Sequence, residues 1–311
     1  MTAAARIGGF AALLVAVFAI ASVTGAAVDP NVGKNDNHEE SMETTNGHSA
    51  HGTESGAEPG GVPGLAVASH GYSLVPETTW IERGATVPFR FRITDESGET
   101  VQDFDLEHER LMHLIVVRRD FEGFQHLHPR QLEDGSWETD LALSEAGVYR
   151  AFADFAIDGA SLTLATDLFV SGPFDPSPLP EPSGTAGAGD GYEVSLDSGA
   201  PSVGGANAAR FVVSRNGDEL ESVEPYLGAD GHLVALREHD QAFLHTHPEG
   251  EAGGSGPISF AVEYPSAGRY RLFLQFKHRG EVRTAAFTQE VSSSGGGTPE
   301  RVEEEAGHGG H

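Results

Sequence analysis

The chain has 311 residues, a length that suits about two ordinary domains. Its 47 acidic and 19 basic residues give a formal net charge of −28 at pH 7, which argues against nucleic acid as a partner because a phosphate backbone requires a basic surface. Cysteine is absent, which excludes disulfides, thiolate metal sites and a lipid-modified N-terminal cysteine.

Residues 1–26 have the pattern of a secretory signal peptide. Arg6 precedes an apolar stretch that starts at Ile7, and small residues lead to a predicted cleavage near Ala26. The apolar stretch is also close to the length of a membrane span, so an uncleaved N-terminal anchor is the alternative, and we expect membrane contact only through this segment. Both interpretations place the rest of the chain outside the cytoplasm, secreted or at the cell surface.

Three low-complexity stretches separate two blocks of ordinary composition. Residues 27–64 are rich in His, Gly and Glu, and residues 292–311 form an acidic tail that contains histidines. Both stretches have too few aliphatic residues to offset chain entropy by burial, so we predict that they are disordered. Residues 172–191 are Pro-rich and then Gly-rich, as in an interdomain linker. The predicted domains are therefore residues 65–171 and 192–291.

The two blocks align with each other. LMHLIVVRRDFEGFQHLHP at 111–129 matches ADGHLVALREHDQAFLHTHP at 229–248, without a gap from the first histidine onward and at an offset of 119. Further on, EAGVYRAFADF at 145–155 matches SAGRYRLFLQF at 266–276 at an offset of 121. This self-similarity indicates a tandem duplication.

Each block has the pattern of short strands. VPFRFRIT at 87–94 and WETDLAL at 137–143 alternate apolar and polar residues, and HLIVV and HLVAL are β-branched apolar runs. Asp158-Gly159 and Arg279-Gly280 predict hairpin turns. Roughly seven short strands per block, without helical periodicity, predict an all-β fold of two tandem Ig-like antiparallel β-sandwiches with disordered tails.

The motif His-x-His-Pro occurs once in each block, at 126–129 and 245–248. If residues 119–122 form a four-residue turn, His113 lies directly across from His128, with Cβ atoms roughly 4.5–5.5 Å apart, and His126 shares their face. Three imidazoles would then converge on one cation, and nitrogen ligands suit Cu²⁺ or Zn²⁺. The same construction predicts a second cluster, which consists of His232, His245 and His247.

Two further residues are candidates at the first cluster. Asp154 offers a fourth ligand or an acceptor that orients an imidazole, and Met112 offers a sulfur beside His113. Their counterparts Gln275 and Gly231 lack these groups, so we expect the first site to be the better one. The alternative for all these histidines is structural: their ring nitrogens bond to backbone, and the following proline ends a strand ladder.

Gly-x-Tyr at 147–149 and 268–270 resembles the tyrosine corner of immunoglobulin-like sandwiches, in which the hydroxyl bonds back to nearby backbone. The longer motif MHLIVVRRDFEGFQHLHP resembles a family of exported Ig-like or cupredoxin-like domains, and that resemblance implies a role in copper or heavy-metal handling.

Lys34 and Lys277 are the only lysines, and this acidic, lysine-poor composition resembles that of haloarchaeal proteins.

Together these patterns predict an extracytoplasmic protein that buffers or delivers copper (Cu²⁺) or zinc, with one histidine cluster per repeat. The alternative is a cell-surface Ig-like interaction module that binds another extracytoplasmic protein and in which the histidines are structural. A zinc hydrolase would need a general base, for which Asp154 is the visible candidate, and the sequence contains no Gly-x-Ser-x-Gly, His-Glu-x-x-His or phosphate-binding glycine loop. We therefore expect no enzymatic activity.

Overall fold

The computed structural model describes residues 62–250 and 252–293, and both repeats lie within one compact unit of the chain. The predicted signal peptide (1–26), most of the predicted disordered segment (27–64) and nearly all of the acidic tail (292–311) lie outside the described residues. The part of the chain that is described forms no helix with the length and apolar character that crossing a membrane requires.

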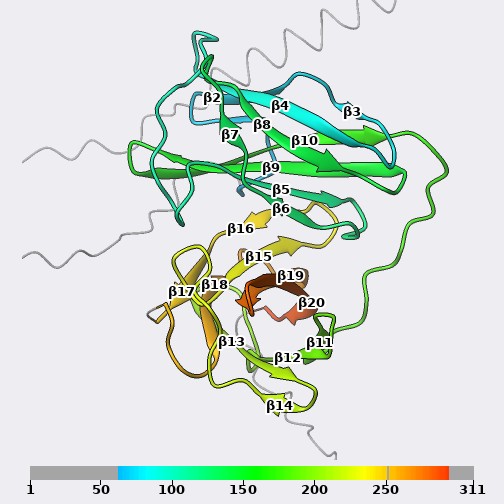
Figure 1. Ribbon diagram of the computed structural model, residues 1–311, viewed down its shortest axis with the longest axis vertical. Helices are drawn as coiled ribbons and strands as arrows, with labels where there is room; N and C mark the ends of the chain where they lie inside the picture. Colours follow the sequence, from blue (N-terminus) through cyan, green and yellow to red (C-terminus); the bar gives the residue numbers. More distant parts are fainter. Residues whose placement is uncertain (1–61, 251, 294–311) are drawn as a thin grey trace, which may run out of the picture. The chain divides into compact units, whose positions relative to one another are not determined.

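Within the described residues, the first repeat is a sandwich of two five-stranded sheets (Figure 1). One sheet has the strand order β1-β2-β4-β8-β7, with bounds Ala68–Ser69, Tyr72–Pro76, Thr86–Thr94, Trp137–Ala142 and Arg130–Gln131. The other sheet has the order β3-β10-β9-β5-β6, with bounds Trp80–Ile81, Ala160–Val170, Gly147–Ile157, His113–Arg118 and Gln125–Leu127. The pairings are antiparallel, apart from the parallel pairing of the short strand β3 with β10.

The second repeat, as far as it is described, pairs a six-stranded sheet with a four-stranded sheet. The larger sheet has the order β11-β12-β13-β18-β17 with β14 beside β13, and its bounds are Thr185–Gly187, Tyr192–Asp197, Ala206–Arg215, Ile258–Glu263, Thr246–Glu249 and, for β14, Asp218–Glu219. The smaller sheet has the order β16-β15-β19-β20, with bounds Phe243–Leu244, His232–Arg237, Gly268–His278 and Glu281–Val291. Strand β11 falls inside the predicted linker (172–191), so this sandwich begins earlier than the composition indicated.

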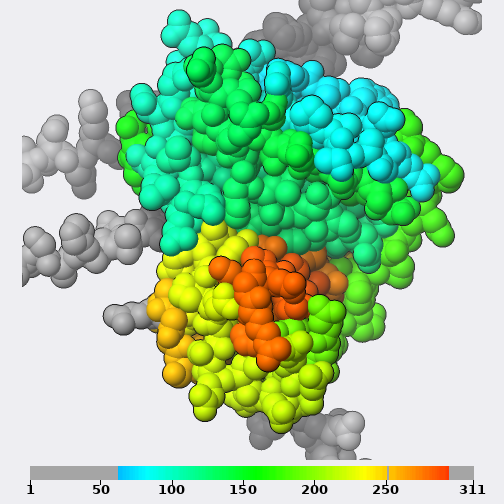
Figure 2. Space-filling model, in the orientation of Figure 1, coloured from blue at the N-terminus to red at the C-terminus, as the bar shows by residue number. Residues whose placement is uncertain are grey.

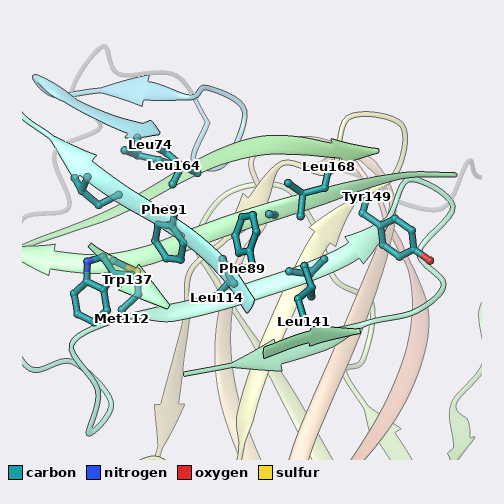
Figure 3. Packing of buried hydrophobic residues seen from close by; sticks show 14 of the residues in the cluster. Leu74, Phe89, Phe91, Met112, Leu114, Trp137, Leu141, Tyr149, Leu164 and Leu168 are labelled. Atoms are coloured by element: carbon teal, nitrogen blue, oxygen red, sulfur yellow. The ribbon is translucent and has the colours of Figure 1, made fainter. Parts of the chain in front are cut away.

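Each sandwich has its own apolar core, formed by alternate residues of its strands. In β4, Phe89, Phe91 and Ile93 are buried while the arginines between them are exposed, as period-two alternation requires. Figure 3 shows Phe89 and Phe91 between the two sheets of the first repeat, in the same cluster as Leu114 of β5 and Leu141 of β8. A separate cluster fills the second sandwich. The predicted tandem β-sandwiches are therefore confirmed.

Both predicted tyrosine corners are present. The hydroxyl of Tyr149 donates to the backbone oxygen of Glu145 at 3.0 Å, and that of Tyr270 donates to the backbone oxygen of Ser266 at 2.8 Å. Gly147 opens the first corner with φ 139°, and a Cβ there would lie 2.9 Å from Cδ of Arg118, so both the conformation and the space favour glycine.

A third apolar cluster joins the two repeats, and we call it the junction cluster. In β5 the side chains alternate, so Leu114 and Val116 belong to the first core while Ile115 and Val117 belong to the junction cluster. The whole junction cluster consists of Ile115, Val117, Phe121, Phe152, Ala165, Val234, Leu236, Phe243 and Phe273. The outer faces of the β5 and β15 sheets therefore pack on each other, and Figure 2 shows the repeats in contact without a cleft between them on the visible face.

Candidate metal centre at the junction of the repeats

The first histidine cluster assembles on the outer face of the β5 sheet. Ile115 of β5 pairs with His126 of β6, and Leu114 pairs with Leu127, which is the register that sets His113 opposite His128. His113 and His126 also share the face of Ile115, because side chains alternate along a strand. The sequence predicted this hairpin register, on which the convergence of the three imidazoles depends.

The three imidazoles lie close enough to share one cation. Ring centroids are 5.2 Å apart for His113 and His126, 5.2 Å for His113 and His128, and 4.8 Å for His126 and His128. One candidate ligand atom from each residue lies within 4.8 Å of the others. Among the described residues, this is the group of three such side chains with that geometry.

The outer nitrogens of two of these rings face carbonyl oxygens. Nε2 of His113 lies 3.2 Å from the backbone oxygen of Glu107, and Nδ1 of His126 lies 2.7 Å from Oε1 of Gln275. The amide of Gln275 also contacts Thr284, whose Oγ1 accepts from Nε2 at 3.3 Å. The inner nitrogens, Nδ1 of His113 and Nε2 of His126, then lie 2.9 Å from each other.

The third imidazole has a ring nitrogen without a partner. Within the part of the chain that is described, Nε2 of His128 is buried and makes no hydrogen bond. Leaving a buried polar atom unpaired costs about 1–3 kcal/mol. This nitrogen is therefore available to a ligand that the protein itself does not supply.

Burial keeps the cluster neutral at ordinary pH. Burial lowers the pKa of His113 to about 4, against an opposing effect of the Asp154 carboxylate. Burial, and then repulsion from His113, lowers the pKa of His126 to about 3. The pKa of His128 falls to about 4 through burial and the nearby Arg110 guanidinium. Neutral imidazole is the form that binds a metal ion, because its free lone pair is the ligand.

Two more histidines reach this cluster. His232 begins β15 in the second repeat, and its ring centroid lies 4.7 Å from that of His126 and 5.5 Å from that of His113, on which it stacks at an interplanar angle of 8°. His108 lies at the tip of the turn that precedes β5, 6.1 Å from His113 and 5.6 Å from His232 by ring centroids. Burial and the surrounding imidazoles lower the pKa of His232 well below its usual value.

Sequence reasoning missed both of these positions. It assigned His232 to a separate site, and it did not include His108 among the candidate ligands. The signal for His232 was the continuous apolar run HLVAL, which predicts burial on both faces of β15 and therefore contact with another sheet.

The predicted second cluster does not assemble, which corrects the expectation of one site per repeat. His245 has its Nε2 3.2 Å from Oγ1 of Thr163 in the first repeat, and His247 is exposed in β17. In the second repeat the chain leaves β15 after Leu244 and crosses to the other sheet, where β17 pairs with β18. In the first repeat β6 remains paired with β5 as far as Leu127, so the crossing comes later and His128 stays near His113.

The two further candidates, Met112 and Asp154, occupy other roles. Met112 is 1% exposed and packs in the core of the first sandwich, because it neighbours His113 in sequence and so points to the opposite face. Asp154 pairs with His113 across β5 and β9, but its Oδ1 accepts a hydrogen bond from Thr163 at 2.7 Å. Its counterpart Gln275 is the residue that contacts an imidazole of the cluster.

The family to which the chain belongs is visible in its two halves. The family described as "Domain of unknown function (DUF8832)" matches twice, at residues 67–172 and 186–293. The chain belongs to this family. The double match confirms the internal duplication, and each DUF8832 domain corresponds to one sandwich.

Comparison with solved structures finds immunoglobulin-like folds at low similarity. The Lin-41 filamin domain shares 14% identity over 36% of this chain and 98% of its own, with a TM-score of 0.24. The Escherichia coli adhesin FdeC shares 14% over 73% of this chain and 65% of its own, with a TM-score of 0.25. The titin Ig tandem A164-A165 shares 12% over 71% and 97%, with a TM-score of 0.20. No curated protein matches the chain.

Proposed function

We propose that this tandem DUF8832 protein binds one transition-metal ion, Cu²⁺ or Zn²⁺, at the cluster of His113, His126 and His128. In this proposal it is a non-enzymatic protein that buffers or delivers the metal outside the cytoplasm. The expected signal peptide or anchor at residues 1–26 supports the location. The orientation of the ring nitrogens is the observation that carries the assignment of the site.

Both outer nitrogens, on His113 and His126, face oxygens that accept hydrogen bonds but cannot donate them. Each outer nitrogen therefore needs the hydrogen of its ring, and a neutral imidazole has one N–H. The two inner nitrogens would then direct lone pairs at each other across 2.9 Å, next to the imidazole of His128, whose Nε2 is unpartnered in the described part of the chain. A cation that accepts these lone pairs removes the repulsion.

The distal hydrogen bonds also match the usual surroundings of a metal-bound histidine. A ligating imidazole almost always donates its other N–H to a carbonyl, a carboxylate or water, and this contact fixes the tautomer and the ring orientation. The backbone oxygen of Glu107 and Oε1 of Gln275 occupy those places. Three imidazole ligands suit Cu²⁺ and Zn²⁺.

A second candidate function is an interaction module in which the histidines are structural. Trp80 in the short edge strand β3 is 66% exposed and lies against Phe169 with ring centroids 5.3 Å apart. Exposed aromatic residues are enriched at protein interfaces, so this edge supports a protein partner. The two functions use different surfaces of the molecule and are tested separately.

The test is a titration with Cu²⁺ or Zn²⁺ of the intact secreted chain and of the double variant His126→Ala/His128→Ala. High salt and an excess of Mg²⁺ suppress nonspecific attraction to the acidic surface. Because the histidines of both tails are present in each sample, the difference between the two titrations reports the cluster alone. We expect one saturable site per chain in the parent that disappears in the double variant.

His247→Ala is the matched control, because His247 is an exposed histidine of the second His-x-His-Pro motif. It should bind like the parent. Equal binding by the parent and the double variant, with circular dichroism confirming that both are folded, would refute the metal proposal.

A further inference from the structure

The second repeat contributes side chains directly to the proposed metal centre. Gln275 faces the outer nitrogen of His126, and the ring of His232 stacks on that of His113. We infer that His232 is a further ligand of the ion and that the bound ion clamps the two repeats together. This inference rests on the proposed function and adds the coupling between metal binding and docking of the repeats.

The spacing of the rings fits one shared ion. Two imidazoles bound to the same ion through bonds of about 2.0–2.1 Å hold their ring centroids roughly 5 Å apart. The ring centroid of His232 lies 4.7 Å from that of His126 and 5.5 Å from that of His113, within 0.3 Å of the 4.8–5.2 Å spacings inside the triad. The nitrogens of His232 are outside the 4.8 Å group, so the inference requires this partly buried ring to turn toward the ion when the ion binds.

The contacts across the junction show why an imidazole of the second repeat is placed here. In the first repeat His113 of β5 pairs with Asp154 of β9, and in the second His232 of β15 pairs with Gln275 of β19. These two cross-strand pairs occupy equivalent positions in the duplicated sequence, and both lie on the sheet faces that pack together. His113 and His232 therefore meet each other as equivalent residues.

The aromatic contacts between the repeats also join equivalent positions, as an approximate two-fold axis between the repeats would require. Phe124 stacks on Phe273 with centroids 4.1 Å apart and an interplanar angle of 9°. Phe243 is the counterpart of Phe124, and Phe152 is the counterpart of Phe273; this second pair is in contact at 5.5 Å. Docking of the two sheets thus brings equivalent positions into contact, and the histidines at the starts of β5 and β15 are one such pair.

A ligand set drawn from both repeats makes the ion a clamp. The triad of the first repeat remains when the repeats separate, so the ion favours docking by the ratio of its affinities for the docked and the separated arrangement, which is roughly 10- to 100-fold if His232 is a ligand. Conversely, separation of the repeats removes His232 from the ligand set. It also moves Gln275, whose Oε1 accepts from the ring N–H of His126, away from that ring. Release of the metal and opening of the junction are then coupled, because each makes the other easier.

The experiment loads the intact chain with one equivalent of Cu²⁺ and counts coordinated imidazoles by pulsed electron paramagnetic resonance. The variants are His232→Ala and His232→Phe, of which the second keeps a planar ring to stack on His113 while it removes both nitrogens. We expect each variant to show one imidazole fewer than the parent and an affinity lower by at least roughly 10- to 100-fold, because removal of a group that only supports a ligand already costs that much. His247→Ala, with its exposed ring, should match the parent in both readouts.

Unchanged imidazole number and affinity in His232→Phe, while His126→Ala/His128→Ala abolishes binding, would overturn the inference and leave the proposed function intact. No specific binding by the parent would instead remove the proposed function. Loss of affinity in His232→Phe without loss of an imidazole signal would assign His232 a packing role and would also overturn the inference.

Discussion

Phe273→Ala tests whether the junction cluster holds the two repeats together. Phe273 is 3% exposed and stacks on Phe124, and it belongs to neither sandwich core. Truncation of a buried phenylalanine costs about 3–5 kcal/mol, and loss of an aromatic pair contributes about 0.5–1.5 kcal/mol beyond burial. We therefore expect Phe273→Ala to remove about 4 kcal/mol, most of it from docking of the repeats.

Differential scanning calorimetry distinguishes loss of docking from loss of a fold. The parent should unfold in one transition because the repeats share the junction cluster, and Phe273→Ala should split it into two. Phe276→Ala is the matched comparison, since Phe276 is 0% exposed in the second core and lies three residues further along β19. It should lower the stability of the second repeat itself. A single transition with an unchanged midpoint in Phe273→Ala would refute the reasoning.

Further predictions concern the corners, pH and the start of the first repeat. Tyr149→Phe and Tyr270→Phe should each cost about 1 kcal/mol in urea unfolding, because each removes one hydrogen bond to backbone; an unchanged midpoint would contradict this. The pKa of His113 is about 4 when folded against about 6.5 unfolded, so the unfolded state takes up protons first as pH falls. This group alone should lower stability by about 2 kcal/mol by pH 5, and the lowered pKa values of His126 and His128 act in the same direction, so the total loss should be at least about 2 kcal/mol. A flat profile of urea midpoints would exclude this linkage. Arg150→Met should speed hydrogen exchange at Gly64, whose backbone oxygen accepts from the buried guanidinium at 2.8 Å, whereas unchanged exchange would show that other contacts hold this segment.

Local pattern was sufficient to predict each sandwich. The alternation around Phe89 and Phe91, and the glycine before Tyr149 and Tyr270, express rules that act over a few residues and that the duplication repeats. The parallel pairing of β3 with β10 was not predicted, because a two-residue strand has no detectable period.

The composition of the histidine site depended on long-range contacts. The hairpin register that brings His113 to His128 followed from the sequence, because turn length and strand alternation fix it. The presence of His232 and Gln275 did not, because it depends on which sheet faces pack together, and no local pattern specifies that. The apolar run from His113 to Val117 did contain part of the information, since a strand buried on both faces requires a second covering layer.

The first His-x-His-Pro motif joins a histidine cluster and the second does not, and this difference follows from the face-to-face packing of the two repeats. Two-fold packing brings equivalent residues together near its axis, so His113 and His232 meet at one place, and sites that would be separate in isolated repeats overlap there. Two overlapping triads would place six imidazoles near this axis. The early crossing of the second repeat after Leu244 removes His247 to the other sheet, and His245 contacts Thr163 instead. Divergence at this crossing thus leaves one asymmetric cluster, in which the first repeat supplies the triad and the second supplies Gln275 and His232 as its neighbours.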